Sequence, residues 1–152
     1  MYLCVGDKRY PMMKITFVTA VVLIVSVACG SGNVFELKIG QCFDDPATER
    51  ELVGDVEIVD CDQAHDNEVY ALFNMPEGDF PALSVVNEAA LDGCYEAFEP
   101  YVGIDYGSSV LDISWFIPSS DSWERIGDRM VVCFAYDLDL KKLTDSVKDS
   151  RA

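Results

Sequence analysis

The sequence is poor in positive charge. Its 152 residues include 11 Lys and Arg against 27 Asp and Glu, so the formal net charge is −16 at pH 7. Nucleic acids and anionic lipid surfaces repel such a chain because both carry dense negative charge. We therefore predict no nucleic-acid partner. The charge keeps a domain soluble, and it is also compatible with attraction to a basic partner or to divalent cations.

Several motifs that carry chemistry are also missing. The chain has one histidine, no Cys-x-x-Cys pair and no Gly-x-Ser-x-Gly sequence. Without Cys-x-x-Cys, a thioredoxin-type redox site and the common zinc motifs are disfavoured. The apolar run Ile15–Ala28 falls short of the roughly 20 residues that a membrane-spanning helix needs. We predict no enzyme activity, no cofactor and no bound metal.

The N-terminal segment has the pattern of an export signal. Lys14 precedes the fourteen uncharged residues Ile15–Ala28, and small residues lead into Cys29. A basic residue, a short apolar run and small residues are typical of a secretory signal peptide. The end of the run resembles a bacterial lipobox, whose cysteine carries diacylglycerol after cleavage, although Ser26 departs from that motif. We predict a lipoprotein-type signal peptide over residues 1–28, with Met13 as an alternative start.

The predicted anchor sets the location of the protein. A lipid on Cys29 would hold it at the outer face of the cytoplasmic membrane, because each buried CH₂ contributes about 0.8 kcal/mol and several chains act together. Residues 29–39, which include Gly30-Ser31-Gly32-Asn33, are interpreted as a flexible tether. A plain secretory signal, and hence a secreted protein, is the alternative.

Four cysteines follow the signal segment: Cys42, Cys61, Cys94 and Cys133. An even number of cysteines outside the cytoplasm indicates two disulfides, and four cysteines allow three pairings. We favour Cys42–Cys61 together with Cys94–Cys133. A zinc site is the competing use of four cysteines, but an exported context favours oxidation.

Hydrophobic periodicity predicts the secondary structure. Apolar residues recur every three or four positions over Ser84–Tyr101, which indicates a helix with Ser84 as its N-cap. Residues 141–152 are polar and are expected to fray. One long helix among four strands predicts an α+β domain over residues 40–150: an antiparallel sheet with one main helix packed on a face, and two disulfides. The predicted strands are Asp55–Asp60, Glu68–Met75, Val110–Ile117 and Arg129–Tyr136.

The single histidine lies in a polar stretch. A hydrolase could use His65 as a base oriented by Asp62, Asp66 or Glu68. The other interpretation is that His65 hydrogen-bonds locally and orders the loop that follows Cys61. Clustered aspartates there could also attract calcium, but the ligand spacing of an EF-hand loop is absent.

Two tryptophans are candidates for binding. Trp115 belongs to an apolar alternation and is expected to be buried, whereas Trp123 lies in a polar segment and is predicted at the surface. An exposed tryptophan can stack on a sugar ring or anchor a partner. We name Trp123, with His65, Asp62 and Asp66, as candidate binding residues.

Several stretches together resemble the actinobacterial septum formation domain family, from about residue 40 to about 150. The most specific is Cys61-Asp62-Gln63-Ala64-His65-Asp66-Asn67-Glu68-Val69-Tyr70. The others are Gly40-Gln41-Cys42-Phe43-Asp44-Asp45, Gly78-Asp79-Phe80-Pro81, Cys94, Tyr101-Val102-Gly103, Trp115, Pro118, Trp123, Gly127-Asp128-Arg129 and Cys133. Gln41 and Ala64 depart from the family pattern. The resemblance implies a membrane-anchored or secreted envelope protein linked to cell division, supports the two disulfides and implies no known enzyme activity or cofactor.

The leading hypothesis is a non-enzymatic envelope lipoprotein domain, a protein-interaction module associated with septum formation whose partner is an unidentified envelope or division protein. An envelope hydrolase using His65 with a nearby carboxylate is the first alternative. A module that binds cell-wall glycan or peptide is the second.

Mass spectrometry of the mature N-terminus tests the anchor. We expect a chain that begins at Cys29 and carries a diacylglyceryl group on its sulfur. A chain with Cys29 unmodified or uncleaved contradicts the lipoprotein hypothesis.

Overall fold

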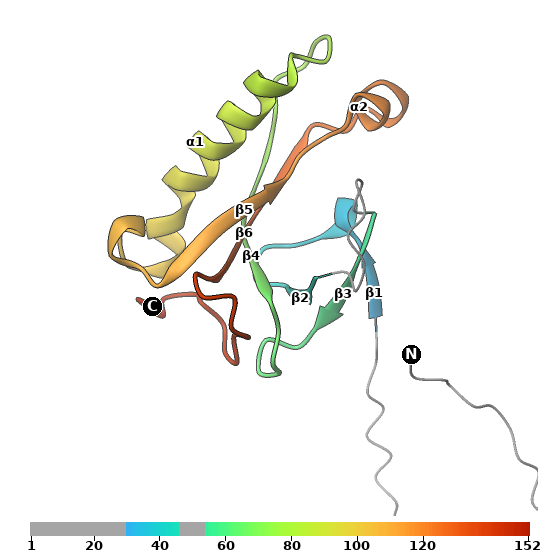
Figure 1. Ribbon diagram of the computed structural model, residues 1–152. Coiled ribbons are helices and arrows are strands. Elements are labelled where there is room, and N and C mark those ends of the chain that lie inside the picture. The colour runs from blue at the N-terminus through green and yellow to red at the C-terminus, as the bar shows by residue number, and fades with distance from the viewer. Residues whose placement is uncertain (1–29, 46–53) are drawn as a thin grey trace, which may run out of the picture.

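The computed structural model describes residues 30–45 and 54–152 (Figure 1). Cys29, Met13 and the whole predicted signal peptide, 1–28, lie outside these residues. Among the helices that the structure describes, none is both long and apolar enough to cross a bilayer.

The described chain forms one antiparallel sheet of six strands, in the spatial order β1-β3-β2-β4-β6-β5. The strands are β1 (Gly30–Asn33), β2 (Cys42–Asp44), β3 (Asp55–Val59), β4 (Asn67–Asn74), β5 (Leu111–Phe116) and β6 (Met130–Asp137). The helices are α1 (Leu83–Val102) and α2 (Ser120–Ile126), with short 3₁₀ turns η1 (Val34–Glu36) and η2 (Tyr106–Ser108). The predicted α+β class is confirmed.

Helix α1 covers one face of the sheet with a regular apolar stripe. Its fully buried residues follow one another at intervals of four, which places them on one side of the helix. They pack against side chains of β4, β5 and β6, and the disulfide Cys94–Cys133 ties α1 to β6. These stripe residues are Val86, Ala90, Cys94, Phe98 and Val102.

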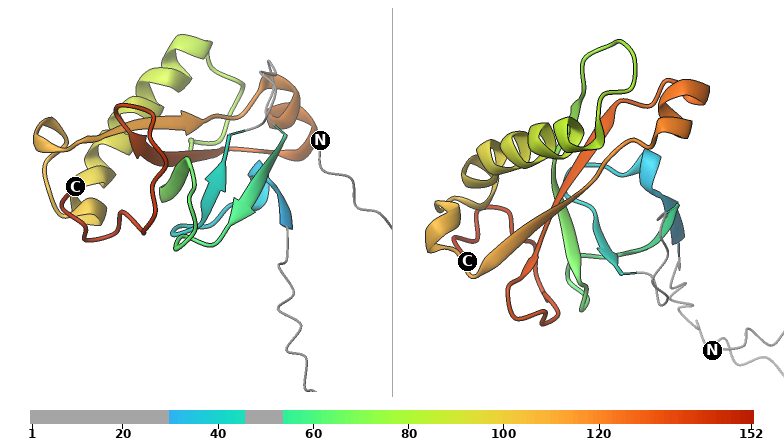
Figure 2. Two further views of the ribbon diagram at one scale, coloured as in Figure 1. Left: turned by 60° about the horizontal axis from the view of Figure 1, so that its bottom comes forward. Right: turned by 45° about the horizontal axis from the view of Figure 1, so that its top comes forward.

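A second core lies on the opposite face of the sheet. The half made of β1, β3 and β2 folds over that face, so α1 and the β1–β3 pair lie on opposite sides of β4, β6 and β5 (Figures 1 and 2). Phe43 of β2 is fully buried there, its ring 5.3 Å from that of Phe134 in an edge-on arrangement. The sequence predicted the helix-covered core but not this one.

The interpretation of residues 29–39 as a flexible tether is wrong for the part that the structure describes. Gly30 pairs with Ile58 across β1 and β3, and the next turn buries Val34 and Leu37 in the second core. Glycine and serine carry no apolar alternation, so a strand held by its backbone alone left no periodic signal.

The start of α1 also differs from the prediction. Ala82, without a side-chain hydrogen bond, is the N-cap, and Ser84 lies inside the helix. The helix ends at Gly103, whose φ of 86° is the left-handed conformation common at C-caps. The polar segment after β5 forms α2. Ser119 is its N-cap and forms a reciprocal capping box with Ser122 at the start of the helix.

The edge strand β5 is fixed by a carboxylate. Asp112 accepts hydrogen bonds from the Tyr106 and Tyr136 hydroxyls and from the Ile113 backbone N–H. Burial alone raises the pKa of Asp112, but these donors outweigh it and hold the pKa below the usual value. The hydrogen bond to Asp112, with burial, raises the pKa of Tyr106 to about 12.

Replacing Asp112→Asn should lower the free energy of unfolding at pH 7 by about 1–2 kcal/mol, because a charged acceptor is lost. A lowered folded-state pKa gives stability that is present above the unfolded value, about 3.9, and is lost as pH falls through the folded pKa. The difference in the free energy of unfolding between wild type and variant should therefore shrink below about pH 4. Urea unfolding at pH 7 and pH 3.5 measures it.

Asp121→Asn is the matched control, since Asp121 is an exposed carboxylate whose ion pair with Arg125 lies at the surface. A difference between wild type and Asp112→Asn that stays constant with pH contradicts the assignment.

Candidate functional site

The polar stretch around the histidine is the loop that joins β3 to β4. The disulfide Cys42–Cys61, with a Cα–Cα distance of 5.2 Å, ties the start of this loop to β2. At the other end, Glu68 of β4 lies opposite Cys42 in the sheet register. Both disulfides are the pairs favoured from the sequence.

His65 is fully buried in this loop. Its Nδ1 lies 2.7 Å from the Gln63 carbonyl oxygen, which can only accept, so Nδ1 carries the proton. The backbone N–H and C=O of His65 both pair with Leu143, at 3.0 and 2.8 Å. Nε2 is buried and has no hydrogen-bond partner among the described residues. The interpretation of His65 as a local loop organiser fits these contacts.

Glu68 is a buried carboxylate with three donors. The Tyr101 hydroxyl (2.7 Å) and the Ser146 hydroxyl (2.8 Å) donate to Oε1, and the Val147 backbone N–H (2.6 Å) donates to Oε2. Burial, with the hydrogen bond to Glu68, raises the pKa of Tyr101 above its usual value. A buried carboxylate is tolerated only when it is hydrogen-bonded in this way.

Two of these donors belong to the C-terminal strap, which we define as residues 138–152. Its Lys142 lies 2.8 Å from carboxylate oxygens of both Asp44 and Asp66, and its Val147 is buried in the helix-covered core. Burial opposes the charge on Lys142, yet the two carboxylates raise its pKa. The expectation that residues 141–152 fray is therefore wrong.

The strap also caps the end of α1. The last carbonyl groups of a helix have no partner within the helix. Here the Asp149 N–H donates to the Tyr101 carbonyl and the Arg151 N–H to the Val102 carbonyl, each at 2.9 Å. Both donors have left-handed backbone, with φ of 56° and 54°. The strap thus caps α1 and also contributes Val147 to the helix-covered core.

These contacts limit the chemistry of the loop. A general base must reach the proton that it abstracts, and Nε2 of His65 has no exposed surface. Asp66 is bound to Lys142 and Glu68 to the strap. Asp62 is exposed, and its carboxylate accepts from the neighbouring Gln63 side chain.

The sulfurs of Cys42 and Cys61 lie within 4.8 Å of each other and of a Glu68 carboxylate oxygen, an arrangement of atom types that could hold a metal. The sulfurs are bonded to each other, however, and so offer no thiolate. The carboxylate oxygens are already hydrogen-bonded to the strap and to Tyr101.

An open cleft of about 380 Å³ lies beside the loop, on the face of the second core. Carboxylates and aromatic rings line it, with one lysine at its rim. Asn67, which is buried, donates to Asp45 at 2.8 Å on its wall. The lining includes Asp45, Asp66, Phe134, Tyr136, Asp137 and Lys141. His65 is not part of it.

Trp123 lies in the helix-covered core, so the prediction of a surface position is wrong. It is 3% exposed, its indole N–H donates to the Gly78 carbonyl at 2.8 Å, and its ring meets that of Phe80 edge-on. The Arg129 guanidinium stacks 3.7 Å from its ring centroid. The polar segment misled the prediction because α2, a single capped helix of seven residues, turns the tryptophan inward.

Sequence reasoning found His65 and Glu68 but missed their partners in the strap. Ser146 and Val147 lie 78 and 79 positions from Glu68, so no local spacing links them. The only signal of burial in residues 141–152 was the two large apolar residues, Leu143 and Val147.

Glu68→Gln should lower the free energy of unfolding by about 1–3 kcal/mol, because the amide group turns a donor toward groups that are themselves donors. We expect faster hydrogen exchange at the Val147 amide, measured by NMR, along with the lower urea midpoint.

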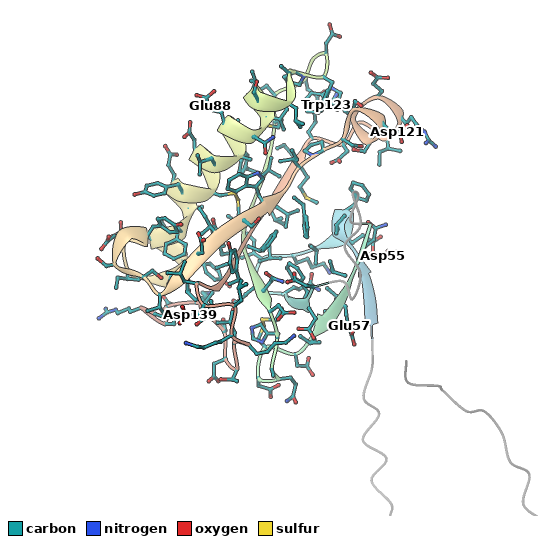
Figure 3. All side chains as sticks on the ribbon, in the orientation of Figure 1. Asp55, Glu57, Glu88, Asp121, Trp123 and Asp139 are labelled. Carbon is teal, nitrogen blue, oxygen red and sulfur yellow. A yellow bond between two sulfur atoms is a disulfide. The ribbon has the colours of Figure 1, made fainter. Side chains whose placement is uncertain are left out.

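Glu88→Gln on the outer side of α1 is the control, since Glu88 projects from the helix into solvent (Figure 3). Equal stability of the two variants contradicts the role of Glu68.

Comparison with known proteins places the chain in a family. The family model described as septum formation matches residues 32–133, well over half of the chain. No curated protein and no solved structure matches it. The matched region contains both disulfides, His65 and Glu68, but ends before the strap. The chain belongs to the septum formation family.

Proposed function

We propose that this protein is a non-catalytic binding domain of the cell envelope that acts in septum formation. Membership of the family associates it with that step of cell division. The observation that carries the non-catalytic part is the burial of His65 and Glu68, whose contacts hold the strap in place.

The motif that contains Cys61, His65 and Glu68 can be explained by its role in the fold, without a catalytic role. Cys61 closes the disulfide to β2, the backbone of His65 pairs with Leu143, and the Glu68 side chain binds Val147. These three residues of the motif thereby join distant segments of the chain. A hydrolase would need at least one of them to face a substrate.

The surface available for a partner is acidic. The cleft of about 380 Å³ combines the carboxylates of Asp45, Asp66 and Asp137 with the rings of Phe134 and Tyr136. Such a lining suits cationic groups of a protein partner better than neutral sugars. Glycan binding through Trp123 loses its support because that side chain is in the core.

The proposed location is the outer face of the cytoplasmic membrane, with a lipid on Cys29. Strand β1 begins at Gly30, so a lipid on the preceding residue would leave no spacer before the folded domain. The domain would then stand directly on the membrane surface, with the β1 side nearest to it.

Depletion of the protein tests the septal role. We expect misplaced or delayed septa and longer cells when nascent wall is labelled and imaged during depletion. Unchanged septum placement together with unchanged cell length contradicts the proposal.

Complementation by Asp62→Asn tests whether an exposed carboxylate near His65 is needed for function. Asp62 is the one exposed carboxylate among the three proposed partners of His65, so its loss should leave the fold intact. We expect normal septa in cells that carry this variant. A septation defect with a normally folded variant contradicts this expectation and shows that the Asp62 carboxylate contacts a substrate or a partner.

A further inference from the structure

The two disulfides differ in their access to solvent. Cys94 and Cys133 are both fully buried between α1 and β6. Cys42 is also buried, but Cys61 is partly exposed in the turn after β3, its Sγ 3.5 Å from the Gly40 carbonyl oxygen. Thiol–disulfide exchange requires a thiolate to reach a sulfur atom. Cys61 is thus the one disulfide cysteine with exposed surface through which a dithiol reductant can approach the folded domain.

The accessible disulfide lies against the anchor of the strap. A Glu68 carboxylate oxygen is within 4.8 Å of the sulfurs of both Cys42 and Cys61. The same carboxylate holds Ser146 and Val147 through the hydrogen bonds described above. A chemical change at the sulfurs therefore occurs beside the group that binds the strap.

The strap has a second attachment, to the loop between β3 and β4, and the same disulfide holds that loop. Cys61 begins the loop, His65 pairs with Leu143 through two backbone hydrogen bonds, and Asp66 binds Lys142. Cutting the disulfide releases one end of this short loop from β2. The contacts of His65 and Asp66 with the strap then depend on a segment that has lost a covalent restraint.

The strap itself is held in a strained conformation. The described residues other than glycine with positive φ are Leu140, Asp149 and Arg151, and all three belong to the strap. Such backbone persists only where surrounding contacts enforce it. Weaker contacts at Glu68 and His65 thus favour detachment of the strap over adjustment in place.

We propose that the Cys42–Cys61 disulfide is a redox-sensitive latch, whose reduction releases the C-terminal strap while the α1 core stays folded. One thiolate of a dithiol attacks Cys61 Sγ, the S–S bond breaks, and Cys42 leaves. The second thiol then displaces Cys61, so the reductant ends as a cyclic disulfide. Two electrons and two protons pass to the protein, and the Cys42 thiol becomes a donor beside Glu68 that competes with Val147. The latch is independent of the septal role.

Release would change the surface at one end of the domain. It uncovers the Glu68 carboxylate and the carbonyl groups of Tyr101 and Val102 at the end of α1. The N–H groups of Asp149 and Arg151, which now cap that helix, become free with the strap. The reduced domain thereby presents polar groups that the oxidised domain keeps covered.

Titration of the full-length protein in detergent with dithiothreitol tests the latch. Alkylation and mass spectrometry report which disulfide is reduced, and hydrogen exchange reports the amides of Leu143, Val147, Asp149 and Arg151. We expect Cys42–Cys61 to be reduced at concentrations that leave Cys94–Cys133 intact. The four strap amides should then exchange at least about tenfold faster, while the β4 and β6 amides keep their protection.

Three outcomes overturn the proposal. Strap amides that stay protected after Cys42–Cys61 is reduced remove the coupling. Simultaneous reduction of both disulfides, or loss of protection in β4 and β6 together with the strap, shows global unfolding instead. The double variant Cys42→Ser/Cys61→Ser provides a matched comparison, since without reductant it should show the fast strap exchange of the reduced wild type.

Discussion

The buried carboxylate of Glu68 is the constraint on which this end of the fold depends. A carboxylate that loses all contact with water is destabilising by several kcal/mol unless donors replace the water. Here the donors come from α1 through Tyr101 and from the strap through Ser146 and Val147. One side chain of β4 therefore joins the last turn of the main helix to the strap. Glu68 is thus one of several attachments of the strap, beside the Leu143 pairing with His65 and the Lys142 ion pairs.

This arrangement explains why the residues that look most chemical in the sequence are structural. A histidine four positions after a cysteine and three before a glutamate has the composition of a catalytic or metal site. In the folded domain, the His65 backbone and the Glu68 side chain bind consecutive parts of the strap, and Cys61 holds the loop that carries both. Polar residues at such a junction give a unique register, because a shift of one residue leaves buried groups without partners.

The sequence predicted the elements that repeat regularly and missed those held by distant partners. Periodicity located α1 and four of the strands to within a residue or two, because each buries one face. Strand β2 is too short for a period, and β1 begins with glycine and serine. The strap has no period at all. Its order comes from contacts with β4 and α1, more than forty positions away in the chain. The predicted surface position of Trp123 was wrong for a related reason. Only the orientation of α2 in the fold decides which side of this polar segment faces the core.

Two of the few cations of this acidic chain make contacts that stabilise the fold. Lys142 lies between Asp44 and Asp66, and Arg129 stacks on Trp123 while its Nε lies 3.4 Å from a Glu77 carboxylate oxygen. Even with every cation counted, the formal net charge of the chain is −16 at pH 7. Two copies of the domain therefore repel each other, and a neighbour that binds the acidic cleft must supply the missing positive charge. If the domain binds a partner through this cleft, as proposed, the partner surface would be basic, and its binding should weaken as salt screens the interaction.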